Sequence, residues 1–257
     1  MPWLLHSKII GKGKPLVILH GLLGTGDNWI SLSRRYADKG FEIHLIDQRN
    51  HGKSFHDDEM NYDVMLDDLS RYLSHYRLTD INLLGHSMGG KTAMFFALEH
   101  PGMLDKLVIV DIAPKYYPPH HRFIFNALEK INLQAHTGRK EIDRLLAKDI
   151  ENPAIRQFLL KNLARDKQQN FYWKANLPVL AASLDELGKA LPPYSVVETD
   201  TLFIKGNLSK YITDKDIPLI KAHFPKAQIS GIERAGHWVH AEQPQKFYDL
   251  TMDFFRQ

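Results

Sequence analysis

Short apolar runs alternate with amphipathic stretches through the first half of the chain. Four runs have the length and composition of buried strands, at residues 16–19, 41–46, 81–84 and 104–110. Apolar residues spaced three and four positions apart predict helices over residues 27–38, 62–76 and 88–100. Strands that alternate with helices are typical of a mostly parallel sheet flanked by helices. The pattern therefore predicts an α/β fold.

The strand pattern stops between residues 115 and 190, where helical stripes replace it. Two proline pairs, Pro118-Pro119 and Pro192-Pro193, bracket this segment and suit stiff connectors. Beyond it, strands are predicted at 201–204 and 227–232, and helices over 213–224 and 242–255. We therefore expect a core domain formed by residues 1–114 and 191–257, and a helical cap formed by residues 115–190.

A tight glycine-rich turn joins the strand at 81–84 to the following helix. Its sequence is Gly85-His86-Ser87-Met88-Gly89-Gly90. A Gly-x-Ser-x-Gly turn between a strand and a helix strains the backbone at the serine and presents its hydroxyl at the carboxyl end of the strand. The helix also directs its amide dipoles at a reacting carbonyl. Ser87 is therefore predicted to be a nucleophile; the competing interpretation is a passive serine in a glycine-rich turn.

A serine hydroxyl needs a positioned base, and the chain offers 14 histidines. His237 stands in a loop between the last predicted strand and the last predicted helix, which is a catalytic position in a parallel sheet. His20 and His86 lie near the serine by motif, and we expect them to serve packing or loop hydrogen bonds. His51 and His240 are interpreted as loop or surface residues. His237 is the predicted base.

A carboxylate must orient the imidazole of that base. Asp111 ends the strand that follows the nucleophile helix, so it should lie beside the strand end that carries Ser87. The other candidate is Asp214, because the strand at 201–204 is followed by Ser209 and reaches no carboxylate before Asp214. Asp111 is the predicted acid, and the chain order Ser87, Asp111, His237 is the order expected for such a triad on this kind of fold.

Two backbone N–H groups should stabilise the oxyanion that forms on the substrate. One belongs to Met88, directly after the nucleophile. The other should come from the loop after the strand at 16–19, where Gly21 lets the backbone approach the substrate and Leu22 is the expected donor, with Leu23 as the alternative. Since only main-chain atoms act here, the side chains of Leu22 and Met88 remain free to line an apolar acyl pocket.

Composition narrows the chemistry further. The chain has 33 basic and 30 acidic residues, a formal net charge of +3, and Lys and Arg are scattered, so no nucleic-acid partner is expected. It has no cysteine, and therefore no thiol nucleophile or thiolate metal site. No apolar run approaches the roughly 18 residues of a membrane span, and the first eight residues lack the pattern of a secretory leader. We expect a cytoplasmic protein without a membrane span, a metal or another cofactor.

Several motifs together resemble the α/β-hydrolase superfamily, and more closely the small bacterial carboxylesterases of the YbfF type, related to the abhydrolase-11 group. They are HGLLG at 20–24, DQRNHGKS at 47–54, GHSMGGK at 85–91, VDIAP at 110–114 and GHW at 236–238. Most of that superfamily carries an aspartate about where Ser209 stands, and this chain departs from the pattern. In the narrower group the acid follows the sixth strand, which matches Asp111, with a serine in the vacated place. The resemblance implies a helical cap inserted after that sixth strand.

The resemblance implies hydrolysis of carboxylic esters, or of acyl thioesters, through an acyl enzyme on Ser87. Related chemistry on the same fold stays open, namely thioesterase, perhydrolase or carbon–carbon bond hydrolase activity. A dehalogenase or epoxide hydrolase would need a carboxylate at position 87. From another functional class, the chain could be a ligand receptor on a hydrolase fold. The sequence carries no signal for an oligomeric state.

Substrate preference is read from the aromatic residues of the predicted cap, which favour an uncharged, apolar acyl group. These residues are Tyr116, Tyr117, Phe123, Phe125, Phe171, Tyr172 and Trp173, and Trp29 and Trp238 are expected near the cleft. The alternative is that they form the core of the cap. Lys115, Arg122 and Lys130 could meet an anionic leaving group such as a coenzyme A phosphate, or form a solvated face. The remaining pocket candidates are His20, Gly21, Leu23, His86 and Ser209.

Overall fold

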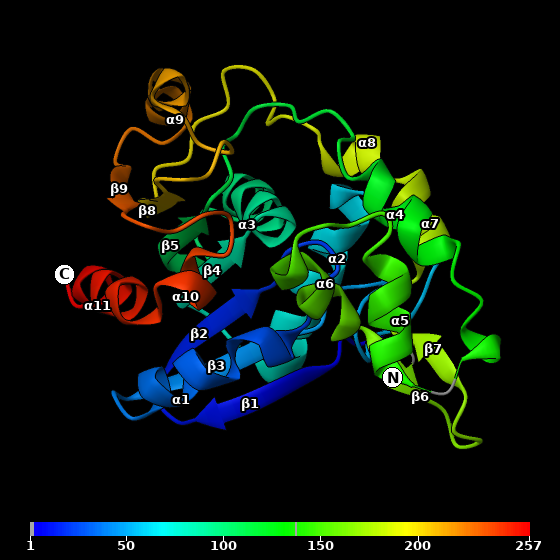
Figure 1. Cartoon of the computed structure of the whole chain (residues 1–257). Helices are drawn as coiled ribbons and strands as arrows, with labels where there is room; N and C mark the ends of the chain where they lie inside the picture. Colours follow the sequence, from blue (N-terminus) through cyan, green and yellow to red (C-terminus); the bar gives the residue numbers. More distant parts are fainter. Residues whose placement is uncertain (1–2, 137) are drawn as a thin grey trace.

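A seven-stranded sheet forms the centre of the computed structural model, which describes residues 3–136 and 138–257 (Figure 1). The strand order is β1-β3-β2-β4-β5-β8-β9. All neighbouring strands are parallel except β1, which pairs antiparallel with β3. The strands are β1 (Ser7–Gly11), β2 (Lys14–Leu19), β3 (Phe41–Ile46), β4 (Ile81–His86), β5 (Leu104–Val110), β8 (Asp200–Gly206) and β9 (Gln228–Ile232).

Helices cover both faces of this sheet because alternate side chains of its strands are apolar on both sides. On β2, Val17 and Leu19 pack in one core cluster, whereas Leu16 and Ile18 pack in the other. The first cluster includes α2 (Tyr62–Tyr76), α3 (Met88–Glu99) and α9 (Ile217–His223). The second includes α1 (Ile30–Ala37), α10 (Val239–Glu242) and α11 (Pro244–Phe255). The 3₁₀ turns η1 (Gly26–Trp29) and η3 (Asp214–Asp216) precede α1 and α9.

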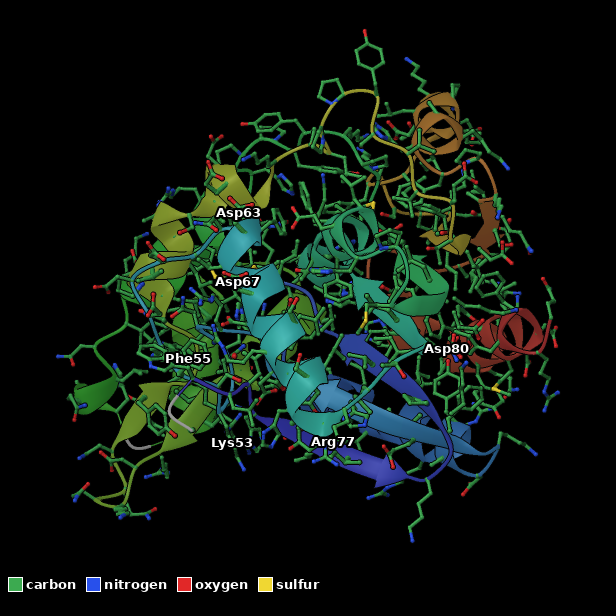
Figure 2. All side chains as sticks on the ribbon, turned by 180° about the vertical axis from the view of Figure 1, so that it is seen from behind. Lys53, Phe55, Asp63, Asp67, Arg77 and Asp80 are labelled. Atoms are coloured by element: carbon green, nitrogen blue, oxygen red, sulfur yellow. The ribbon has the colours of Figure 1, made fainter. Side chains whose placement is uncertain are left out.

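Helix α2 shows how the amphipathic pattern selects a face. Met65 and Leu69 are buried against the sheet, whereas Asp63 and Asp67 are exposed. Figure 2 shows these two carboxylates on the solvent side of the helix. Asn61 caps the helix by accepting a hydrogen bond from the N–H of Val64 at 3.0 Å.

The segment between β5 and β8 leaves the sheet and gathers on one side of the molecule (Figure 1). It contains α4 (Arg122–Glu129), η2 (Leu133–Ala135), α5 (Arg139–Leu146), α6 (Pro153–Leu160), α7 (Leu177–Ala182), α8 (Leu184–Leu187) and a hairpin of β6 (Leu163–Arg165) and β7 (Phe171–Trp173). The helical stripes expected here are confirmed. The expectation that strands are absent from this segment is wrong, because strands of three residues are too short to show an alternating pattern.

The α/β-hydrolase fold expected from the motifs is confirmed, with two differences in detail. The edge strand β1 escaped the sequence pattern because none of its five residues is fully buried, and Ile9 at its middle is 45% exposed. The strand that the resemblance counts as sixth, before Asp111, is the fifth along this chain. No helix of residues 3–136 and 138–257 is long and apolar enough to cross a membrane. Met1 and Pro2, part of the N-terminal stretch considered above, lie outside the described residues.

Candidate active site

Ser87 occupies the strained turn that the sequence predicts between β4 and α3. Its backbone has φ 53° and ψ −117°, which a residue with a side chain adopts only when its surroundings hold it there. A Cβ on Gly85 would lie 2.2 Å from the carbonyl oxygen of Gly89, and one on Gly89 would lie 2.4 Å from that of Leu19. Both glycines are therefore required for α3 to start so close to the sheet.

His237 lies in the loop between β9 and α10, and two neighbours fix its ring. Its Nδ1 lies 2.8 Å from Oδ2 of Asp111. The ring of Tyr211 stacks on it, with centroids 3.9 Å apart and an interplanar angle of 19°. A neutral imidazole that donates from Nδ1 to a carboxylate presents Nε2 as a proton acceptor. The geometry thus gives His237 the tautomer that a general base requires.

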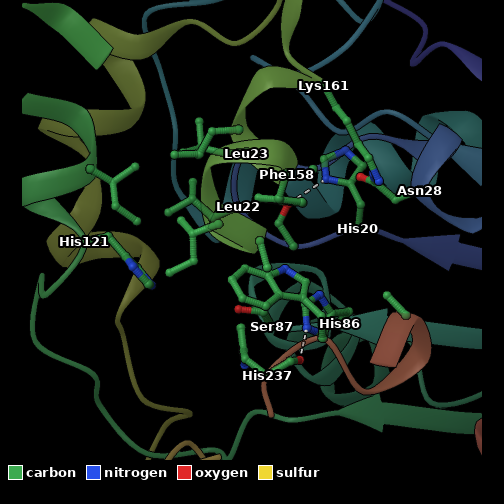
Figure 3. A pocket seen from close by; sticks show the side chains of 18 of the residues that line it. His20, Leu22, Leu23, Asn28, His86, Ser87, His121, Phe158, Lys161 and His237 are labelled. Carbon is green, nitrogen blue, oxygen red and sulfur yellow. Dashed lines mark hydrogen bonds between the residues drawn. The ribbon is translucent and has the colours of Figure 1, made fainter. Parts of the chain in front are cut away.

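Ser87 and His237 line the same cavity (Figure 3). Among the described residues, however, the hydroxyl of Ser87 makes no hydrogen bond to His237. Hydrogen bonds between a nucleophile and its base often tighten only when substrate is bound. A hydrogen bond between Ser87 and His237 is therefore expected when substrate is bound, whereas the hydrogen bond between His237 and Asp111 is already formed.

Asp111 is fully buried at the carboxyl end of β5 and is surrounded by donors. Its Oδ1 accepts a hydrogen bond from the N–H of Gly206 at 3.1 Å, and its Oδ2 accepts one from the hydroxyl of Ser209. The alternative acid, Asp214, has an exposed side chain that pairs with Lys205 at 2.7 Å. Of the two carboxylates considered from the sequence, Asp111 is the one that is hydrogen-bonded to His237. Ser209, which stands where most of the superfamily carries an aspartate, donates a hydrogen bond to Asp111.

Burial shapes the protonation of this pair. It lowers the pKa of His237, and the charge of the neighbouring His120 lowers that pKa further, so the imidazole is neutral at pH 7. Burial also raises the pKa of Asp111, while the hydrogen bonds from Ser209 and Gly206 oppose this rise. A neutral base beside an ionised carboxylate is the state that general-base catalysis needs.

The other histidines near the site hold loops together. His86 donates from Nε2 to the carbonyl oxygen of His237 at 2.8 Å (Figure 3). His20 donates from Nδ1 to the carbonyl oxygen of Gly21 at 2.9 Å and accepts from the N–H of Gln48 at 3.0 Å. These are the loop hydrogen bonds expected from the motifs.

Of the two histidines expected in loops or at the surface, His51 lies in a loop and His240 does not. His240 lies in α10, is 5% exposed and stacks on Trp29 at a centroid distance of 3.9 Å. His51 is in a loop but fully buried. The sequence alone could not show this burial, because the apolar neighbours of both residues come from distant segments.

The two leucine N–H groups weighed from the sequence differ in whether they are already hydrogen-bonded. The N–H of Leu23 donates to Nε2 of His51 at 3.1 Å, so it is not available to a substrate. Among residues 3–136 and 138–257, the N–H of Leu22 has no acceptor. A Cβ on Gly21 would lie 3.1 Å from Cβ of Ser87, so this loop runs directly against the nucleophile. Met88, the first residue of α3, has an N–H with no intrahelical partner.

A cavity of about 810 Å³ opens in front of Ser87. Of the residues expected to surround the nucleophile, His20, Gly21, Leu22, Leu23, His86, Trp29 and Trp238 line it. Ser209 does not line it and instead contacts Asp111. The rest of the wall is mostly apolar, with Phe123, Ile124, Ile155, Phe158 and Leu159.

Two of the seven aromatic residues expected at the cleft lie beside Ser87. Phe123 lines the large cavity, and Tyr117 lines a smaller cavity that Ser87 also lines. Phe125 and Phe171 are instead buried in the core, which agrees with the alternative interpretation. The expected cations are also elsewhere, because Lys115 pairs with Asp216 and Lys130 with Asp149, each at 2.8 Å.

The sequence analysis missed several residues at the cavity, namely Tyr211, His120, His121 and Lys161. Tyr211 had a detectable signal, since it lies two residues after Ser209 at the end of a core strand, where aromatic side chains can reach the site. The described residues contain no group of three or more His, Asp or Glu side chains that could hold a metal ion.

Comparisons with known proteins identify relatives of this chain. The family model for the alpha/beta hydrolase fold matches residues 14–136. The chain is 36% identical over 254 residues to the sn-1-specific diacylglycerol lipase ABHD11 of Danio rerio, covering 96% of this chain and 80% of that protein. It is 34% identical over 236 residues to Esterase YbfF of Escherichia coli, covering 91% and 89%. A solved marine microorganism esterase superposes with a TM-score of 0.95 at 43% identity, covering 98% and 99%.

Proposed function

The chain belongs to the α/β-hydrolase fold family and is an ester-hydrolysing enzyme, and from that premise we propose that Ser87, His237 and Asp111 carry out the reaction. The observation that carries the proposal is the buried Asp111–His237 hydrogen bond of 2.8 Å beside a serine on a strained turn. We further propose that residues 115–190 act as a cap over this site. The cytoplasmic location expected from the sequence stays a prediction.

The first half of the reaction transfers the acyl group to the enzyme. The hydroxyl oxygen of Ser87 attacks the ester carbonyl carbon while Nε2 of His237 takes the hydroxyl proton. The negative charge that develops on the carbonyl oxygen is stabilised by the N–H groups of Leu22 and Met88, and each such donor typically contributes a factor of about 10² to 10³ in rate. His237 then returns the proton to the leaving oxygen, and the alcohol departs.

The second half repeats this sequence with water. His237 takes a proton from a water molecule, which attacks the acyl group on Ser87, and the carboxylic acid leaves as the proton returns to the serine. Asp111 remains ionised throughout and stabilises the imidazolium that forms twice per turnover. An acyl thioester has the same reacting carbonyl, so matched oxygen esters and thioesters assayed side by side would assign the preference between them.

The test is burst kinetics with a chromogenic short-chain ester. We expect a burst equal to the enzyme concentration, and a loss of about 10⁴-fold or more in kcat for Ser87→Ala. Ser70→Ala is a matched control, because Ser70 lies on α2 and contacts His100. A fluorophosphonate should label the control and not Ser87→Ala. If Ser87→Ala keeps most of the activity, the proposal is wrong, and labelling without turnover would instead indicate a ligand receptor.

A further inference from the structure

Two cavities meet at Ser87, and they differ about twentyfold in volume. The large one, of about 810 Å³, is lined by both Ser87 and His237. The small one, of about 40 Å³, is lined by Ser87, Leu22 and Met88 but not by His237. Its other walls combine apolar residues with polar ones. The apolar residues are Ile112, Pro118, Leu184 and Leu187, and the polar ones are Lys91, Tyr117, His120, His121 and Tyr211. A substrate attached to Ser87 therefore has two directions in which to extend.

The chemistry of the proposed reaction decides which part of the ester takes which direction. In the tetrahedral intermediate the carbonyl oxygen faces the N–H groups of Leu22 and Met88. The leaving oxygen must lie within reach of Nε2 of His237, because that nitrogen supplies its proton. His237 lines the large cavity, so the alcohol must extend into it. The acyl chain takes the remaining direction, past Leu22 and Met88 into the small pocket.

We propose that the small pocket is the acyl site, and that the enzyme prefers esters of short carboxylic acids with large apolar alcohols. The inference rests on the proposed function of Ser87 and His237. A site for one water needs about 10–15 Å³, so about 40 Å³ holds about three groups of that size. Acetyl to butanoyl groups fit, and longer chains do not. The apolar wall around Phe123, Ile155 and Phe158 takes the alcohol.

Two of the segments that line the small pocket are tied to each other. The ammonium of Lys91, which lines it, donates to the carbonyl oxygens of Lys115 and Lys189, each at 2.6 Å. The N–H of Tyr117 donates to the carbonyl oxygen of Gly188 at 2.8 Å, and a Cβ on Gly188 would lie 2.0 Å from the carbonyl oxygen of Tyr117. A long acyl chain would have to break these contacts, which is why its length is limited.

The wild-type experiment compares two isomeric esters, octyl acetate and ethyl octanoate, by acid release in a pH-stat. They have the same composition and similar leaving groups, so they differ mainly in which side of the ester is long. We expect kcat/KM to be about 100-fold or more higher for octyl acetate, because the last four carbons of the octanoyl chain have no room in the small pocket. Equal rates, or a preference for ethyl octanoate, would overturn the inference.

A variant pair then locates the limit. Leu184→Ala enlarges the small pocket and should raise kcat/KM for ethyl hexanoate relative to ethyl acetate by about 10-fold. Leu159→Ala is the matched control, since Leu159 is equally buried but lines the large cavity. It should change the dependence on alcohol length and keep the order of acyl lengths. A parallel shift in both variants would contradict the assignment.

Leu184→Phe provides the opposite change if the alanine variant fails to fold, as judged by its thermal melt. It fills the pocket and should impair ethyl butanoate more than ethyl acetate; an equal loss for both would count against the acyl site. Failure of the inference is distinguishable from failure of the proposed function. Turnover that depends on Ser87 with a preference for long acyl groups refutes the inference alone, whereas no Ser87-dependent turnover of any ester refutes the function.

Discussion

At the scale of the residue, the site depends on two side chains whose backbone lies in the left-handed region. Ser87 has φ 53° and Asp111 has φ 49°. Such conformations cost roughly 1–3 kcal/mol each for a non-glycine residue. Hydrogen bonds to the neighbouring strands hold both residues in place. The N–H of Ser87 donates to the carbonyl oxygen of Val110 at 3.0 Å, and the N–H of Asp111 donates to the carbonyl oxygen of Ile204 at 2.8 Å. The strand ends therefore aim both side chains away from the sheet.

Asp111→Asn tests the acid directly. An amide of the same shape cannot favour the tautomer that donates from Nδ1 of His237, so we expect kcat to fall by about 10⁴-fold with a small change in KM. Steady-state kinetics on a short-chain ester measures this. Asp214→Asn is the control, because Asp214 has an exposed side chain paired with Lys205 and should stay within about twofold of wild type. A large loss in the control alone would move the acid to Asp214.

At the scale of the element, α3 joins Ser87 to both ends of the segment between β5 and β8. Ser87 precedes its first turn, and Lys91 lies one turn further along. The ammonium of Lys91 is 1% exposed and bonds to carbonyl oxygens at Lys115 and Lys189, where the chain leaves the core after β5 and approaches it again before β8. The helix that follows Ser87 thus also ties together the two ends of the segment between β5 and β8.

Lys91→Met should therefore destabilise the protein. It keeps the apolar stem but leaves two carbonyl oxygens without their donor, so we expect a loss of about 2–4 kcal/mol in the free energy of unfolding. Urea unfolding followed by circular dichroism measures it. Lys130→Met is the matched control: Lys130 is 64% exposed in its pair with Asp149 and should change stability by less than about 0.5 kcal/mol. Equal losses of stability in the two variants would contradict a stabilising role for the hydrogen bonds of Lys91.

At the scale of the whole molecule, four neighbouring parallel strands bring the site together. Ser87 follows β4, Asp111 follows β5, Ser209 follows β8 and His237 follows β9. Carboxyl ends of parallel strands share one edge of the sheet, so residues 126 positions apart, such as Asp111 and His237, come into contact. At this edge Asp111 is fully buried, and the side chain of His237 is 17% exposed.

This burial has a consequence for pH dependence. The base must be neutral, and burial followed by the charge of His120 lowers the pKa of His237 below its usual 6.5. The buried pair takes up its first proton at a lower pH than a free histidine. We expect the acid limb of the kcat/KM profile below pH 6.5, with full activity kept between pH 8 and 7. An acid limb above 6.5 would contradict this, and His120→Gln should move the limb toward neutral pH.

The sequence by itself determined the features that depend on local conformation and periodicity. Alternating apolar runs predicted the parallel sheet and its helices, because burial on two faces imposes that pattern on neighbouring residues. The glycines around Ser87 also predicted the strained turn, because their effect on the backbone is limited to a few neighbouring residues. The order of strand ends also indicated Asp111, although Asp214 remained open.

Only the tertiary structure decided which distant groups meet. In the folded chain His237 is hydrogen-bonded to Asp111, whereas Asp214 forms an ion pair with Lys205. It also committed the N–H of Leu23 to His51, which leaves Leu22 as the donor. The unequal cavities on either side of Ser87 likewise arise from the packing of α8, the chain around Tyr117 and the cap helices. Such distances depend on how remote segments pack, and no local pattern records that packing.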